Sequence, residues 1–107
     1  MRIIILTVLS AVIATVIAGC AVVKVPDATG GSKSDGTVDM SYEYGMFEKP
    51  QVQWDKALIT ARQRCQAWGY RDAEPFGRAT EKCEAYNGYG NCVRQLVTRK
   101  YQCTGSN

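Results

Sequence analysis

Histidine is the residue type that this chain lacks altogether. Because histidine is the commonest general base and the commonest metal ligand, catalysis or metal binding would have to rely on other side chains. Long runs of one charge are also missing, since 13 Lys and Arg residues are interspersed with 10 Asp and Glu residues. Nucleic-acid binding usually requires a basic cluster or stripe, so this distribution argues against a nucleic-acid partner.

One apolar run is present, from Ile3 to Val16, and it follows the positive charge of Arg2. It is shorter than the roughly 20 apolar residues that a membrane-spanning helix needs. A positive charge, an apolar run and then small residues are typical of a secretory signal peptide. We therefore predict a signal peptide over residues 1–19. The alternative is an uncleaved N-terminal anchor.

The apolar run ends in Ile17-Ala18-Gly19-Cys20, which resembles the lipobox of bacterial lipoproteins. The resemblance implies that the Cys20 thiol carries a diacylglycerol, and that cleavage before it frees an amine for a further acyl chain. Two or more chains hold a protein stably on a membrane. Cys20 is followed by alanine instead of the aspartate that implies inner-membrane retention in this class. The resemblance therefore implies the outer membrane, with the domain facing the periplasm.

Residues 20–35 contain Pro26, two adjacent glycines and two serines, without hydrophobic periodicity. This composition is typical of a flexible linker. We predict a lipidated N-terminus and flexible tether over residues 20–35, followed by one folded domain over residues 36–105.

One segment before the hairpin is predicted to be a strand, and a second is ambiguous. Residues 37–44 alternate strictly between polar and apolar side chains, which indicates a half-buried strand. Residues 69–77 are predicted to be a short edge strand or a loop, because Pro75 cannot donate to a central ladder. The apolar face of the first strand carries Val38, Met40, Tyr42 and Tyr44.

An amphipathic helix is predicted between these two segments. Asp55 is a plausible N-cap, and Gly69 stands where a helix C-terminus is expected. One apolar stripe recurs at helical spacing. Its members are Trp54, Ala57, Leu58, Ala61, Cys65 and Trp68.

A long hairpin is predicted for the C-terminal segment. Asn87-Gly88 is its turn signal, because a type I′ turn needs positive φ at both central residues. A non-hydrogen-bonded pair in the resulting register, Cys83 with Cys92, brings two Cα atoms close enough for a disulfide. The three facing pairs are Tyr86 with Tyr89, Glu81 with Arg94, and Cys83 with Cys92.

Four cysteines remain after Cys20, and an even number in a short exported chain indicates disulfides. The hairpin register pairs Cys83 with Cys92, which leaves Cys65 on the helix for Cys103 on the last strand. In this register the strand face that carries Cys103 would also carry Lys82 and Glu84 of the partner strand, which would place charge against the core. A bulge that shifts the register would relieve this misfit. A four-cysteine zinc site is the rival interpretation, but no two cysteines have the C-x2–4-C spacing that such sites usually show.

Together these elements predict an α+β fold: a small disulfide-stapled domain with a helix on one face of an antiparallel sheet. Four segments resemble the YecR-like lipoprotein family: residues 41–50 followed by Trp54, residues 61–70, residues 86–92 and residues 101–105. The resemblance implies an envelope lipoprotein, associated with the flagellar regulon in some members. The family has no established biochemical activity, so the resemblance supplies no catalytic residues.

The leading functional hypothesis is a lipid-anchored binding module that contacts an unidentified envelope protein through Tyr86, Asn87 and Tyr89. Exposed tyrosines on a stapled hairpin form a rigid amphipathic surface. The plainer interpretation is a glycine-rich turn whose tyrosines pack on each other. An inhibitor or exclusion lipoprotein acting on an envelope enzyme is an alternative that the sequence does not separate from the first.

An enzyme is the least favoured hypothesis. A hydrolase would need a nucleophile with a base, or a pair of carboxylates, and the sequence brings no two of its carboxylates together. We predict no catalytic residues, no cofactor and no metal. The candidate carboxylates are Asp39, Glu43, Glu74, Glu81 and Glu84.

Overall fold

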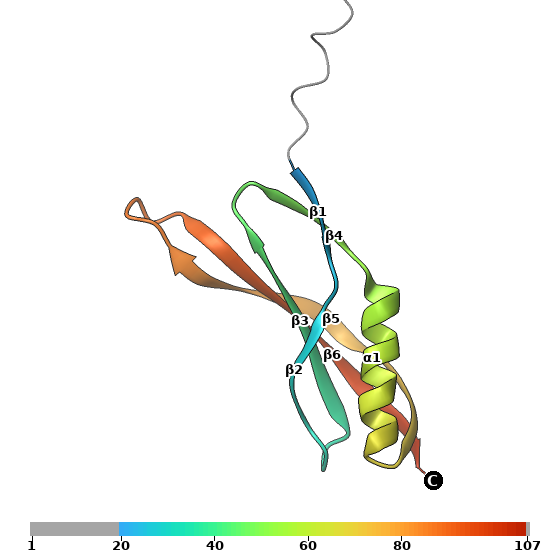
Figure 1. Ribbon diagram of the computed structural model, residues 1–107. Coiled ribbons are helices and arrows are strands. Elements are labelled where there is room, and N and C mark those ends of the chain that lie inside the picture. Colours follow the sequence, from blue (N-terminus) through green and yellow to red (C-terminus); the bar gives the residue numbers. More distant parts are fainter. Residues whose placement is uncertain (1–19, 107) are drawn as a thin grey trace, which may run out of the picture.

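The computed structural model describes residues 20–106, so the predicted signal peptide lies outside the described part of the chain. One helix lies against a four-stranded antiparallel sheet of order β2-β3-β6-β5, and β1 and β4 form a separate parallel pair (Figure 1). This arrangement confirms the predicted α+β fold. The elements are β1 (Cys20–Lys24), β2 (Asp27–Ser32), β3 (Thr37–Gly45), β4 (Glu48–Val52), α1 (Trp54–Ala67), β5 (Tyr70–Tyr86) and β6 (Cys92–Ser106).

Strand β3 lies inside the sheet and follows the predicted alternation. Val38 and Met40 face the helix and are almost fully buried. The opposite face also buries Ser41, which the pattern assigned to the wet side. Its hydroxyl lies 2.8 Å from the hydroxyl of Thr29 on β2 and 2.8 Å from that of Thr98 on β6. A buried hydroxyl is tolerated when it is hydrogen-bonded, and this row of hydroxyls supplies the partners.

The predicted tether over residues 20–35 is wrong for most of its length. Strand β1 pairs with β4, and β2 pairs with the sheet strand β3. The glycines taken as signs of flexibility serve close packing instead: Gly31 has a φ of 140°, and an added Cβ would clash with the carbonyl oxygen of Thr37. A register shift lies between Ala28 and Gly30. Strands β1 and β2 therefore belong to the folded domain, which does not begin at residue 36.

Helix α1 packs closely on the sheet because small residues form its contact face. Ala57, Ala61 and Cys65 are fully buried.

The predicted cap at Asp55 is wrong: the N-cap residue is Gln53, whose backbone N–H donates to the carbonyl oxygen of Lys24 at 2.9 Å. Pairing of β1 with β4 thus sets where the helix begins. Asp55 lies in the first turn, where its negative charge interacts favourably with the helix dipole.

The helix ends as the sequence predicts. Gly69 has a φ of 95°, and its N–H donates to the carbonyl oxygen of Gln66 at 3.1 Å. Strand β5 follows directly and lies at the edge of the sheet, which is the position that Pro75 permits. The short segment over residues 69–77 and the first arm of the predicted hairpin are therefore one long strand.

The predicted hairpin register is wrong, although its disulfide is present. Tyr86 lies opposite Cys92 instead of Tyr89, and Glu81 lies opposite Val97 instead of Arg94. Register shifts on either side of Ala85 account for the difference. With this register Lys82 pairs with Leu96, on the face away from the helix, so the predicted misfit of charge against the core does not occur.

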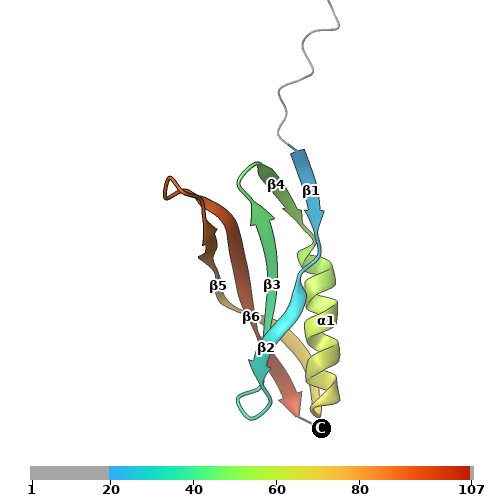
Figure 2. The ribbon, with the colours of Figure 1, turned by 60° about the vertical axis from the view of Figure 1, so that its left-hand side comes forward.

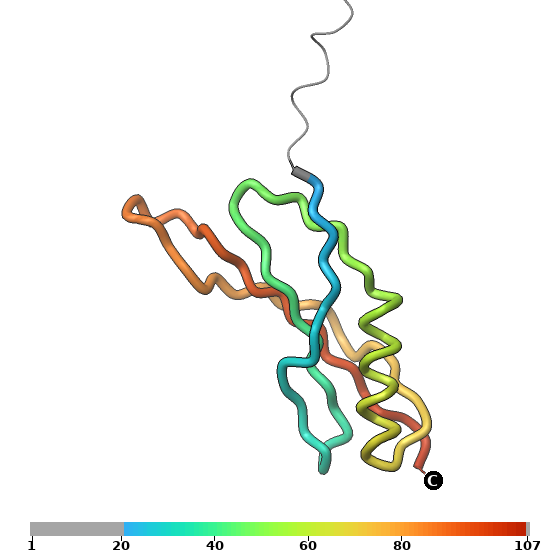
Figure 3. Tube along the Cα trace, in the orientation of Figure 1, coloured from blue at the N-terminus to red at the C-terminus, as the bar shows by residue number. Residues whose placement is uncertain are grey.

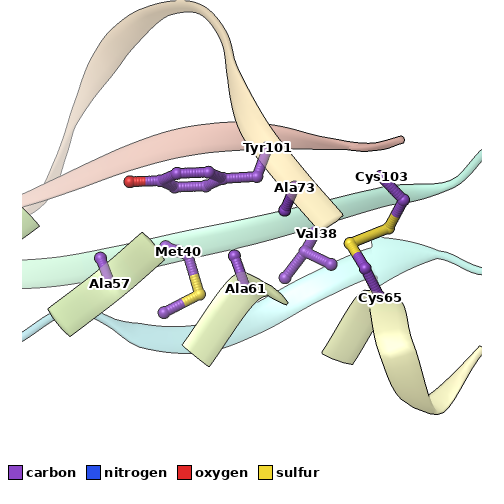
Figure 4. Packing of buried hydrophobic residues seen from close by; sticks show 8 residues of the cluster. All are labelled: Val38, Met40, Ala57, Ala61, Cys65, Ala73, Tyr101 and Cys103. Atoms are coloured by element: carbon purple, nitrogen blue, oxygen red, sulfur yellow. A yellow bond between two sulfur atoms is a disulfide. The ribbon is translucent and has the colours of Figure 1, made fainter. Parts of the chain in front are cut away.

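The core lies between α1 and the sheet and includes a disulfide (Figure 4). Cys65 on the helix bonds Cys103 on β6, with their Cα atoms 5.4 Å apart. The second disulfide joins Cys83 and Cys92, with Cα atoms 5.9 Å apart. These are the two pairs that the sequence predicts. The buried cluster comprises Val38, Met40, Ala57, Ala61, Cys65, Ala73, Tyr101 and Cys103.

Candidate functional site

The β5–β6 tip is a five-residue loop organised by one asparagine side chain. Asn87 Oδ1 accepts the backbone N–H groups of Tyr89 at 2.9 Å and Asn91 at 3.0 Å. The Asn87 N–H donates to the carbonyl oxygen of Asn91 at 2.9 Å, and Gly90 has a φ of 82°. Asparagine side chains commonly replace backbone acceptors in this way. This bonding closes the chain at residues 87 and 91, which explains why the predicted two-residue turn does not form.

The two tyrosines of the tip point into solvent. Tyr86 is 67% exposed and Tyr89 is 91% exposed. Asn87, the third predicted contact residue, is half-buried, and its side-chain oxygen is already used within the loop. The tip therefore presents two aromatic side chains on a closed loop behind the Cys83–Cys92 disulfide, and Asn87 positions them.

Glu43 and Glu84 form a carboxylate pair that sequence reasoning missed. The Glu43 carboxylate, which lies beside Glu84, raises the pKa of Glu84. Arg94 also lies here, with its Nε 3.8 Å from Glu43 Oε2. The pair depends on the register shift next to Ala85; the charge misfit in the sequence called for a shift of this kind but did not place it there. Both carboxylates are exposed, so they form a surface charge cluster and not an enclosed acid–base site.

Two of the other candidate carboxylates, Glu81 and Asp39, contact neighbouring side chains, and Glu74 is exposed on β5. Tyr44 Oη donates to Glu81 Oε1 at 3.4 Å, and partial burial together with the Glu81 charge raises the pKa of Tyr44. Asp39 faces Lys100 at 4.0 Å. Within residues 20–106, no three His, Cys, Asp or Glu side chains are grouped so that they could hold a metal ion.

A second exposed apolar group lies in the β3–β4 turn. Phe47 is 83% exposed and Met46 is 43% exposed. Gly45, just before this turn, lies opposite Arg94 near the start of β6, so the turn and the hairpin tip share one end of the sheet (Figure 2). Sequence reasoning missed this group, although an apolar dipeptide between Gly45 and Glu48 was a visible signal.

Strand β1 begins at the same end of the domain (Figure 3). Cys20 is the parallel neighbour of Glu48, and Lys24 Nζ lies 3.3 Å from Glu48 Oε1. Glu48 also accepts the backbone N–H of Gly45 at 2.6 Å. This hydrogen bond and the Lys24 charge hold the pKa of Glu48 below its usual value. Strand pairing thus holds the backbone at Cys20 next to the β3–β4 turn, with no unpaired segment between them.

No helix within the described residues is long and apolar enough to cross a membrane. The family model of the YecR-like lipoproteins matches residues 25–104. The chain belongs to this family. The match in this lipoprotein starts before β2, in keeping with the finding that the domain begins earlier than residue 36. Comparison with curated proteins gives no significant match.

Proposed function

We propose that this YecR-like lipoprotein is held at the outer membrane by an acylated Cys20 and acts there as a non-catalytic binding module. Family membership supports the lipid anchor, and the lipobox residues before Cys20 specify its position. A domain that is held on a membrane needs little intrinsic affinity for a neighbour, because anchoring raises the effective concentration.

The observation that carries the binding role is the exposure of Tyr86 and Tyr89 on a rigid loop. Buried tyrosine contacts are common binding hot spots, since the ring contributes a large area at a low conformational-entropy cost. The Cys83–Cys92 disulfide and the Asn87 hydrogen bonds order the loop before any partner arrives. Pre-ordering lowers the entropic cost of association, which favours a specific contact with another envelope protein.

Photo-crosslinking in intact cells tests the binding role. A photoreactive residue replaces Tyr89 in one strain and Gln63, an exposed residue on α1, in the control strain. We expect a discrete protein adduct from position 89 alone, and mass spectrometry of that adduct identifies the partner. An adducted enzyme whose activity falls on adding the purified lipoprotein would establish the inhibitor alternative. Equal adducts from both positions, or none, would reject the tip as the binding surface.

The anchor is tested separately. Intact-mass analysis of the mature chain should show acylation at Cys20, and a Cys20→Ala chain should leave the membrane fraction. The flagellar association that the resemblance implies makes swimming motility the phenotype to score in the same strains.

A further inference from the structure

We propose that the β3–β4 turn, formed by Met46 and Phe47, rests on the surface of the membrane that holds the Cys20 lipid. This inference rests on the proposed function, because it takes Cys20 to be the acylated residue. It goes beyond a lipid anchor, since it gives the folded domain a second membrane contact and therefore a fixed orientation.

The first argument is the exposure of an apolar turn. Phe47 presents 83% of its surface to solvent, and Met46 presents 43%. Turns are usually polar because they face water, so a Met-Phe pair between Gly45 and Glu48 lacks a folding reason. The Phe47 side chain instead suits the interface of a bilayer, where aromatic residues are enriched.

The second argument is distance from the anchor. Cys20 and Glu48 are register partners in the β1–β4 pair, and neighbouring strands lie about 4.8 Å apart. Phe47 directly precedes Glu48, so its backbone lies next to that of the anchor residue. Pairing continues to Lys24 with Val52, and the Lys24–Glu48 ion pair adds to it. Acyl chains inserted at Cys20 would therefore bring the turn to the bilayer surface.

The third argument is charge. Glu48, the one acid within residues 45–49, accepts a hydrogen bond from the Gly45 N–H and forms an ion pair with Lys24. Lys49 is exposed and forms no ion pair with any residue in the range 20–106. A free lysine beside an aromatic residue suits the phosphates of lipid headgroups. The exposed Lys49 thus gives this turn a cation that can pair with lipid phosphates.

Fluorescence quenching in vesicles tests the contact. The full acylated chain is reconstituted in phosphatidylethanolamine with a minor share of phosphatidylglycerol, with or without bromine on the acyl chains. Phe47→Trp is compared with Ile59→Trp, an exposed position on α1, over the shared background of Trp54 and Trp68. We expect brominated lipid to remove most of the emission gained at position 47 and to leave the emission gained at position 59.

Equal quenching at both positions, or none at position 47, would overturn the proposal. Intact mass separates the two levels of failure: an unacylated chain rejects the anchor and this contact together, whereas an acylated chain without quenching at position 47 rejects the contact alone.

Hydrogen exchange of the unsubstituted chain provides a measurement that needs no variant. The amides of residues 46 and 47 should exchange more slowly in the acylated chain on vesicles than in the same chain expressed without residues 1–19 and therefore unacylated in solution, and unchanged rates would also overturn the proposal.

Discussion

Single side chains decide the two local features on which the proposed contacts depend. Asn87 closes the hairpin tip through its side-chain oxygen, and Glu48 joins the start of β1 to the β3–β4 turn. Neither residue belongs to the buried core. Their substitutions should therefore change local order more than global folding.

Replacing Asn87 with alanine should loosen the tip. The Asn87→Ala change removes the acceptor for two backbone N–H groups, and exposed hydrogen bonds of this kind contribute about 1 kcal/mol each at most. We expect faster hydrogen exchange at residues 89 and 91 with little change in the denaturation midpoint. Asn91→Ala is the matched control, because only the backbone of Asn91 takes part in these bonds. Equal effects of both variants would contradict this role for the Asn87 side chain.

Acidification should loosen the attachment of β1. The pKa of Glu48 is lowered in the folded state, chiefly by the Gly45 N–H and then by Lys24, so ionised Glu48 stabilises the fold at pH values above its unfolded pKa. That contribution is lost as the pH falls through the folded pKa. The stability difference between the unsubstituted chain and Glu48→Gln should therefore shrink in acid. Urea titrations at a series of acidic pH values measure this difference in unfolding free energy, and the exposed Glu74→Gln variant is the control. A difference that stays constant with pH would contradict the linkage to Glu48.

At the scale of elements, the two disulfides have different roles. Cys65–Cys103 joins α1 to β6 inside the core, whereas Cys83–Cys92 joins the two arms of the hairpin outside it. The first closes a long loop across the fold, and the second closes a short local one, with sequence separations of 38 and 9. One bond should therefore govern global stability, and the other should govern the rigidity of the tip.

Removing each bond separately should show this division. In the loop-entropy model the Cys65–Cys103 bond contributes about 4 kcal/mol and the Cys83–Cys92 bond about 3 kcal/mol. Double replacement of Cys65 and Cys103 by alanine also leaves a core cavity, so we expect the larger loss of unfolding free energy in urea. Double replacement of Cys83 and Cys92 should cost less and should raise hydrogen exchange at the tip. A larger global loss from the second variant would contradict the assignment.

At the scale of the whole molecule, the proposed contact surfaces and the core disulfide lie toward opposite ends of the domain. The start of β1, the β3–β4 turn and the hairpin tip share the first end, and the C-terminus of the helix and the β2–β3 turn lie at the other (Figure 1). The Cys65–Cys103 bond lies toward the second end, near the helix C-terminus. The proposed contact surfaces are thus separated in space from the core disulfide, which should make binding and stability separable by mutation.

Truncating both tip tyrosines should remove function without unfolding the protein. Tyr86 and Tyr89 are largely exposed, and changes at exposed positions usually alter stability by about 0.5 kcal/mol or less. For the double alanine variant we expect an unchanged denaturation midpoint together with loss of partner capture or of the envelope phenotype. Ile59→Ala on the helix provides a matched exposed control. If every phenotype persists in the tyrosine variant, the tip is only a turn.

The sequence by itself determined the parts whose signals are local. The alternation before Tyr44 gave β3, the apolar stripe through Cys65 gave α1, and the lipobox together with the family motifs gave the class of protein. Burial follows side-chain periodicity, so these features can be read without knowing which segments meet. The two disulfide pairs were also predictable, because the hairpin pair is local and the remaining two cysteines had no other partner.

Only the tertiary structure decided what depends on strand pairing between distant segments. Strands β1 and β2 have no periodic pattern, and they form because β4 and β3 offer backbone partners. The closeness of Glu43 and Glu84, and of Cys20 and Phe47, likewise depends on registers set by bulges and by a parallel pair. Backbone hydrogen bonds carry no side-chain signature, so the end of the domain where these residues gather could not be read from their order in the chain.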